Sequence, residues 1–365
     1  MKDFFKKYIP LSFMISLPLA LLSFLLLYRC RTNSALADRV SGGVGAVLRR
    51  AMATLTNSLP VSLAEILVIA LVLGVIALVF ISLFAVRRAR TRVRILLHIF
   101  AFAFTMYSWY AVAFGASYHT QPINEKMGFD IVEVDETDLD TLATYLALEL
   151  NSLAPCVGAA GEGSAMQYGT RELSEKAVLA YTEFLDDYPI FENFESYVKP
   201  VMLSELMAYA GLLGMYTYFT GESNVSVVYP DYCIPSAVIH EFAHQRGVAR
   251  EDEANFLAYT ACSYSDDAYI RYSGYLNLFE YTASALSRTD KARVSEIYSM
   301  LDKTVLEDLK AYSEFYYAHK STLLRDVSSF FNDTYLKANG TAGVVSYSMV
   351  VRLSVSYYKS IGTIP

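Results

Sequence analysis

The residues of this chain that could perform chemistry gather between positions 240 and 255. The segment His240-Glu-Phe-Ala-His244 places two histidines four residues apart. On a helix this spacing puts both imidazoles on one face, close enough to bind one Zn²⁺ ion. The carboxylate of Glu241, beside the first histidine, is of the type that polarises a water molecule next to such a metal. The alternative is an ordinary helix that carries two histidines.

The residues around the motif favour a continuous helix. Pro235 suits a helix start, no proline or glycine interrupts the motif, and Gly247 can end the helix. A hydrolytic zinc site needs a third protein ligand. In the pattern His-Glu-x-x-His-x-x-Gly-x-x-His the last histidine supplies that ligand, but Arg250 stands there, and a cation does not bind zinc. The metzincin pattern is therefore excluded.

Two carboxylates after the motif compete for the role of third metal ligand. Glu251 opens a second helix after the connection 245–250, and that helix can fold back on the first. Because Glu251 and Asn255 are four residues apart, they share a helical face. We expect Glu251 to bind the metal and Asn255 to orient one of the two histidines. Glu253 is the alternative ligand, and acidic residues at a helix start also have a purely structural use.

Two other parts of a hydrolytic site are less defined in the sequence. Val225–Tyr229 is β-branched, ends at Pro230, and is the best strand candidate. Such a strand could pair with an extended peptide or only close the core. A further group must stabilise the oxyanion of the reaction. The candidates, among which the sequence does not choose, are Tyr264, Tyr269, Tyr272, Arg271 and His319.

The composition is that of a membrane protein. Hydrophobic residues make up 54% of the chain, and the mean hydropathy is +0.30. Crossing a bilayer takes about 20 helical residues. Segments of sufficient length and apolarity lie at about 11–28, 61–86 and 95–117. Lysines precede the first, as in a signal peptide, but Arg29-Cys-Arg31 is a poor cleavage site, so we interpret this segment as a retained anchor.

The distribution of charge predicts the orientation. Residues 1–114 carry 13 Lys and Arg against three Asp and Glu, whereas the whole chain has a net charge of −7. The remainder is thus acidic, which excludes nucleic acid as a partner. Five arginines crowd the link between the second and third segments, so this link is expected to be cytoplasmic and residues 118–365 extracytoplasmic. The arginines of the link 29–60 oppose this assignment but are less concentrated.

The remaining sequence predicts a mostly helical domain with a small β element. Residues 44–55 suit an amphipathic helix, which could lie at the membrane interface or pack as part of a loop. Residues 118–134 suit a linker or short strand, 154–170 suit a mobile loop, and 220–224 suit a turn. Four cysteines allow at most one disulfide in residues 118–365, or buried thiols. Besides the motif helix, we expect helices at Asp135–Leu153, Arg171–Asp187, Tyr197–Tyr218, Glu251–Tyr264, Asp266–Leu286, Lys291–Phe331 and Val344–Tyr358.

The chain resembles known protein families, both in one short motif and over nearly its full length. Glu251-x-x-Ala-Asn255 resembles the Glu-x-x-Ala-Asp helix of integral-membrane CAAX-prenyl endopeptidases and the Glu-x-x-x-Asp element of thermolysin-like gluzincins, with Glu251 on the ligand position. Nearly the whole chain resembles bacterial three-span membrane proteins of unknown function that are classed as zinc metallopeptidases. That resemblance rests on Leu59–Ile66, Thr220–Val225, His240–Tyr259, Tyr335–Lys337 and Gly343–Tyr347. It implies a membrane-anchored, gluzincin-like protein.

Together these features predict a mainly α membrane protein. A membrane module of three transmembrane helices (1–117) would precede a mostly helical, zincin-like extracytoplasmic domain (118–365). The expected function is that of a zinc metallopeptidase in which His240, His244 and Glu251 bind Zn²⁺ and Glu241 is the general base. Expected partners are the lipid bilayer and a peptide or protein substrate of the cell envelope. The non-enzymatic alternative is a zinc-stabilised envelope sensor or scaffold, for which Glu241 would have no use.

Overall fold

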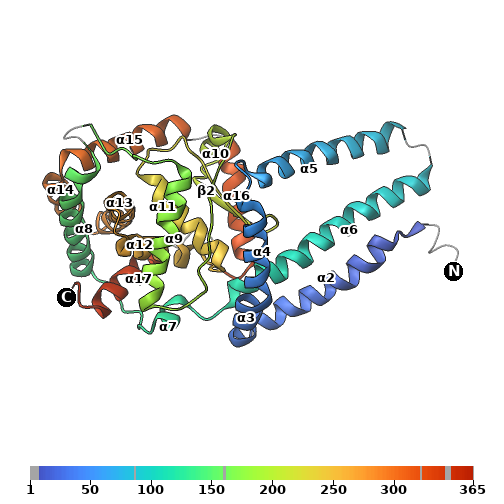
Figure 1. Cartoon of the computed structure of the whole chain (residues 1–365), viewed down its shortest axis with the longest axis horizontal. Coiled ribbons are helices and arrows are strands. Elements are labelled where there is room, and N and C mark those ends of the chain that lie inside the picture. The colour runs from blue at the N-terminus through green and yellow to red at the C-terminus, as the bar shows by residue number, and fades with distance from the viewer. Residues whose placement is uncertain (1–7, 86–87, 159–161, 321–322, 342–346, 365) are drawn as a thin grey trace.

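A computed structural model shows how the chain folds and describes residues 8–85, 88–158, 162–320, 323–341 and 347–364. Within these residues the protein is mainly helical. Three long helices project from one side of a larger domain (Figure 1). The predicted ends at Val86 and Val344 lie outside the described residues.

Among the residues that the structure describes, three helices are long and apolar enough to cross a membrane. They are α2 (Leu11–Cys30), α5 (Leu63–Phe80), which continues through η2 (Ile81–Ala85), and α6 (Ala89–Ala113). The three apolar segments predicted from the sequence are thereby confirmed as helices. The third starts earlier than the predicted position 95, because its arginines are good helix formers with long apolar stems. It ends where Phe114 leaves helical geometry.

The three helices place the predicted cytoplasmic segments at one end. The start of α2, the end of η2 and the start of α6 lie at the end remote from the domain, and the opposite ends of the three helices lie against it (Figure 1). An odd number of spans requires this arrangement.

The link between the first two spans packs against the large domain. It contains α3 (Ser34–Val40), η1 (Ser41–Gly45) and α4 (Ala46–Asn57). Arg49 on α4 is buried, and its guanidinium donates to the carbonyl oxygens of Gln245 (3.2 Å), Ala113 (2.9 Å) and Ser41 (3.0 Å). The Arg49 guanidinium thus donates to carbonyl oxygens at the C-terminal ends of α11 and α6, where the last carbonyls of a helix have no hydrogen-bond partner within it. Of the two possibilities for residues 44–55, the packed helix is the one observed.

Helices form the core of the large domain. Its N-terminal elements are η3 (Gly115–His119) and α7 (Ile123–Met127), where a linker or strand was expected. Asp135 caps the next helix in a reciprocal capping box with Asp138. The main helices are α8 (Glu136–Val157), α9 (Thr170–Asp187), α11 (Cys233–Arg246), α12 (Glu251–Tyr264), α13 (Ala268–Leu286) and α17 (Tyr347–Ser360). The expected helices in these regions are confirmed, and all four cysteines are free.

The predicted helix at Tyr197–Tyr218 is wrong. This segment forms β1 (Lys199–Pro200), the short helix α10 (Ser204–Tyr209) and β2 (Gly214–Thr217). The apolar run reads as a helix, but Gly211 adopts φ +74°, which a helix cannot continue through. The backbone then turns into an extended strand.

The strand predicted at Val225–Tyr229 is displaced toward the N-terminus. The observed strand, β3 (Glu222–Val225), takes up most of the predicted turn and ends where the predicted strand would begin. It pairs in parallel with β1 and antiparallel with β2, in the order β1-β3-β2. The edge strand beside the cavity described below is therefore β2, and β3 is the central strand.

The long helix expected at Lys291–Phe331 is divided into three. They are α14 (Lys291–Met300), α15 (Lys303–His319) and α16 (Leu323–Ala338). Asp290 caps the first, and Asp302 caps the second by accepting from the Thr304 amide at 2.8 Å. These capping residues start new helices, whereas the spacing of apolar residues alone predicts one continuous helix. Figure 1 shows that α4 and α16 lie where the spanning helices meet the domain.

Candidate metal centre

The helix that carries the motif is the central helix of the domain. Almost every side chain of α11 is buried, which is typical of a core helix enclosed on all sides. It packs against α9, α12, α13 and the sheet. Tyr181 of α9 donates to the carbonyl of Ile239 at 2.8 Å, and Ser223 of β3 donates to that of Glu241 at 3.1 Å. These contacts fix the part of α11 that carries the motif.

A tight turn brings α12 back to the motif. Gly247 ends α11 with φ +100°, and the Val248 amide donates to the Ala243 carbonyl at 3.0 Å. A side chain at Gly247 would also collide with Arg49. The connection is shorter than the sequence suggested, because α11 extends to Arg246. Glu251 is the first residue of α12, as predicted.

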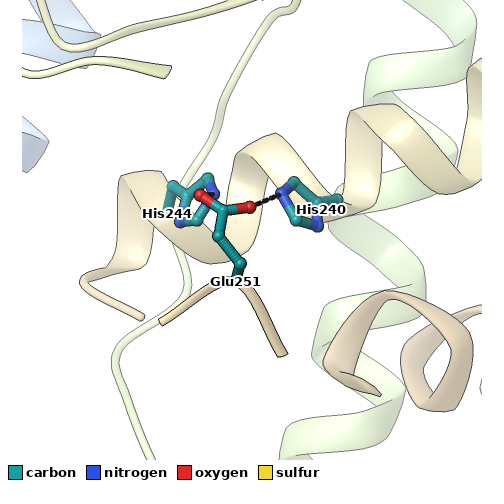
Figure 2. Close-up of side chains that lie close together, drawn as sticks. All are labelled: His240, His244 and Glu251. Carbon is teal, nitrogen blue, oxygen red and sulfur yellow. Dashed lines mark ion pairs between the residues drawn. The ribbon is translucent and has the colours of Figure 1, made fainter. Parts of the chain in front are cut away.

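The structure brings His240, His244 and Glu251 together. Figure 2 shows the Glu251 carboxylate between the two imidazoles. Its Oε2 lies 3.4 Å from Nε2 of His240, and its Oε1 lies 3.6 Å from Nε2 of His244. One ligand-type atom from each residue falls within 4.8 Å of the others. Because the residues come from two helices, only the turn at Gly247 allows this proximity.

This arrangement fits a zinc ion. Zinc bonds of 2.0–2.2 Å at tetrahedral angles separate neighbouring ligand atoms by about 3.4 Å. The two nitrogen–oxygen distances, 3.4 and 3.6 Å, are close to that separation but involve different oxygens of Glu251, and one ligand atom from each residue lies within 4.8 Å of the others. Two imidazoles and one carboxylate also match the donor set of open hydrolytic sites, which keep a fourth position for water.

A backbone contact orients His244. Its Nδ1 lies 2.7 Å from the carbonyl oxygen of Val248 and can only donate to it. When this imidazole is neutral, Nε2 is therefore the atom with a lone pair available to a metal. The expectation that Asn255 would orient a histidine is not met for His244. Asn255 lines the adjacent cavity, and among the described residues no hydrogen bond joins it to either imidazole.

Burial and charge set the protonation of the metal-free cluster. Burial alone would raise the pKa of Glu251, but His244 and His240 hold it well below its ordinary value. Burial alone would lower the pKa of His244, and the Glu251 carboxylate more than reverses this, to about 9. Without a metal, His244 therefore keeps its proton and pairs with Glu251.

Glu241 lies against the edge strand of the sheet. Its carboxylate is buried, and the Oε2 atom has no hydrogen-bond partner within the described residues. A side chain at Gly214, the first residue of β2, would overlap that carboxylate. Burial raises the pKa of Glu241, opposed by the two histidines and by a hydrogen bond with the Tyr216 backbone. The carboxylate is therefore a stronger base than an exposed glutamate.

Glu253, the competing ligand candidate, is turned away from the histidines. Its carboxylate pairs with Arg250 at 2.6 Å and accepts from the Ile123 amide at 2.9 Å. It is buried in those contacts, where it holds α7 against α12. Of the two carboxylates, Glu251 is the one within reach of both imidazoles.

A cavity of about 620 Å³ opens beside the cluster. His240, His244, Glu241 and Glu251 line it, and the edge strand β2 forms part of its wall. Of the five oxyanion candidates, His319 is at the cavity wall. The other four do not line it; Tyr272, for example, donates to Asp308 at 2.7 Å.

Four residues of this site had no signal in the sequence. Gly214 and Tyr216 lie in the segment predicted to be helical, and Phe114 and Tyr118 lie just after the third span. The negative charge of Glu251 contributes to the raised pKa of Tyr118, so the two side chains are close. The residue types and spacing of these four residues form no recognisable motif, so only the folded chain shows that they line the site.

Comparison with known proteins gives one finding. No curated protein and no solved structure matches the chain. A family profile matches residues 41–355, which covers the link between the first two spans, the site and most of the helices that follow. The chain therefore belongs to the family described as "Protein of unknown function (DUF3810)".

Proposed function

We propose that the protein is a membrane-anchored zinc metallopeptidase whose large domain faces the extracytoplasmic side. One observation carries the proposal. His240, His244 and Glu251 converge within 4.8 Å at the wall of a cavity that also contains the buried carboxylate of Glu241. A purely structural zinc site has four protein ligands and needs no adjacent base. The four residues here correspond to three ligands and a base.

In the proposed reaction, three residues bind the metal and a fourth transfers protons. His240, His244 and Glu251 would hold Zn²⁺, which when bound acts as a Lewis acid toward a carbonyl and makes water more acidic. Glu241 takes a proton from the attacking water and returns it to the amine that leaves. Its pKa is raised by burial, and the histidines oppose this shift without cancelling it, so the carboxylate accepts a proton more readily than an exposed glutamate.

The edge strand provides a place for the substrate backbone. β2 stands at the end of the order β1-β3-β2, and Gly214, Met215 and Tyr216 line the cavity. An extended peptide can add to such an edge through main-chain hydrogen bonds. This would lay a scissile bond beside Glu241, whose carboxylate contacts the same strand.

The orientation rests on charge. The arginines at the start of α6 lie at the same end of the bundle as the start of α2, opposite the large domain. Of the arginines that oppose this orientation, Arg49 is buried in the domain and Arg50 pairs with Glu192. These two are used in packing, so we place the domain outside and take envelope peptides as substrates.

Replacing Glu241 by glutamine tests the proposal. The variant keeps the size of the side chain but removes the base, so it should retain zinc and lose at least about 100-fold in peptide hydrolysis. Peptides recovered from the envelope of cells with wild-type protein and with Glu241→Gln can be compared by mass spectrometry. Glu296→Gln, on a helix that does not line the cavity, is the matched control. Equal peptide sets in all three strains would favour a zinc-stabilised scaffold.

A further inference from the structure

Helix α16 has one face toward the cavity. The residues that line it are Arg325, Ser328, Asn332 and Tyr335, at successive spacings of three, four and three. This spacing defines one side of a helix. α16 is thus part of the wall of the candidate active site.

A second face of α16 is apolar and exposed. Leu323 is 81% exposed, Phe330 and Phe331 are each 66% exposed, and Val327 between them is also exposed. These residues also recur at helical spacing, on a different side from the cavity residues. Large exposed aromatic side chains in a continuous stripe mark a surface that contacts another apolar phase.

A second part of the cavity wall, beside α16, has a similar apolar margin. Ala208 and the segment 211–216 contribute to the wall next to α10. Immediately beside them, Met202 is 63% exposed, and Leu203 and Leu206 are also exposed. We call these residues and the exposed stripe of α16 the two apolar margins of the cavity.

The C-terminal end of α16 and the α10 margin itself are both bound to the domain ends of the spanning helices. At α16, Tyr110 of α6 donates to Oδ1 of Asn339 at 2.6 Å, and Arg31, just after α2, donates to the Ala338 carbonyl at 2.6 Å. At α10, the Glu65 carboxylate in the first turn of α5 accepts from the amides of Met202 (2.9 Å) and Leu203 (2.8 Å). Helices α16 and α10 are therefore both held where the three apolar helices meet the domain.

We propose that both apolar margins are seated in the interfacial layer of the bilayer, so that the cavity opens at the membrane surface. The apolar surface of the three spans continues into the margins, which identifies lipid as their occupant. The substrates are then polypeptides anchored in the same membrane and cut close to their anchor. This substrate class rests on the peptidase function proposed above, whereas the seating of the margins does not.

Nitroxide accessibility tests the seating. Cys156 is the exposed cysteine and the other three are buried, so Cys156→Ser gives a background for labelling. Labels at Phe331→Cys and Leu206→Cys, in the full chain in phosphatidylethanolamine–phosphatidylglycerol vesicles, should favour oxygen over a water-soluble nickel chelate. Ser329→Cys, exposed on the same helix, is the control and should show the reverse. Nickel preference at both apolar positions overturns the seating, and so does shielding from both reagents, which indicates a protein partner.

Anchored peptides test the substrate class. A degenerate peptide library carries a palmitoyl anchor and polar spacers of about 5 to about 30 residues, which reach about 16 to about 100 Å when extended. Cleavage should already occur with the shortest spacers. A requirement for spacers above about 20 residues overturns the proposed opening at the surface. If no library is cut while the labels report lipid, the peptidase function fails and the seating stands.

Discussion

The ring of Phe114 meets the imidazole of His244 edge to face, with centroids 6.0 Å apart and an interplanar angle of 84°. Phe114 is the residue at which the third spanning helix ends, and His244 belongs to the candidate metal site. Phe114 also packs against Tyr216 of the edge strand, with centroids 5.3 Å apart. The end of the membrane bundle is thus in direct contact with the site.

Because of this contact, the motif lies near the spanning helices in the fold although it is far from them in the sequence. The motif begins more than a hundred residues after the last span, which by itself indicates a site remote from the membrane. In the folded chain α11 returns to the end of α6, because Arg49 and Phe114 both contact it. Separation along the chain therefore does not measure distance from the bilayer here.

Metal content should depend on three side chains. The full chain should bind about one zinc ion, and His240→Ala, His244→Ala and Glu251→Gln should each lose most of it, since each removes one of three ligands. Glu253→Gln is the matched control and should keep its zinc, because its contacts lie with Arg250 and Ile123. Plasma mass spectrometry of purified protein gives the stoichiometry. Full zinc in both histidine variants would refute the site.

Replacing Gly214 by alanine should impair hydrolysis and spare metal binding. The added methyl group would overlap the Glu241 carboxylate and displace it from its position. A misplacement of about 1 Å can cost about 100-fold in rate. Gly169→Ala is a suitable control, since its added methyl group would meet nothing within 4 Å. Zinc content and hydrolysis of a confirmed substrate should be measured together; unchanged hydrolysis would show that Glu241 does not need this position.

Zinc affinity should increase with pH up to about 9. In the metal-free protein the pKa of His244 is raised to about 9, so below that value the metal must displace a proton from its imidazole. One displaced proton gives about a tenfold gain in affinity for each pH unit, and the gain should level off above the pKa. Competition with a chelator of known pH dependence measures this. An affinity that is flat between pH 7 and 9 would show that His244 is neutral before zinc binds.

Reporter fusions should place the two ends of the bundle on opposite sides. A reporter fused after Arg90 should behave as cytoplasmic, and one fused to the C-terminus as extracytoplasmic. The geometry requires opposite results, since Arg90 lies at the end of α6 remote from the domain. Cytoplasmic behaviour at the C-terminus would reverse the orientation and remove envelope peptides as substrates.

The convergence of the metal residues could be predicted because it depends on local rules. The i, i+4 pair His240 and His244, the helix-ending Gly247 and the start of α12 at Glu251 are each encoded within a few residues. The choice of Glu251 over Glu253 was also predicted from a local spacing, but part of its cause is distant. Glu253 is engaged by Arg250, three residues away, and by the amide of Ile123, which is far away in the sequence.

The part of the cavity wall formed by β2 could not be predicted, because it depends on contacts between residues that are distant in the sequence. The segment 197–218 carries a helix-like apolar pattern, and its extended part is stabilised by pairing of β2 with β3. Gly214 matters only because α11 brings Glu241 against it. Likewise, nothing in the sequence around Phe114 indicates a partner on α11.

The guanidinium of Arg49 makes the helix that carries the motif depend on the N-terminal part of the chain. It donates to the carbonyls of Gln245, near the end of α11, and of Ala113, at the end of α6. The C-terminal end of α11 therefore rests on a platform formed by the link between the first two spanning helices. A truncated chain that begins at residue 118 would lack this platform and leave buried carbonyls unsatisfied. Biochemical work on the site accordingly calls for the intact chain, solubilised with its spans.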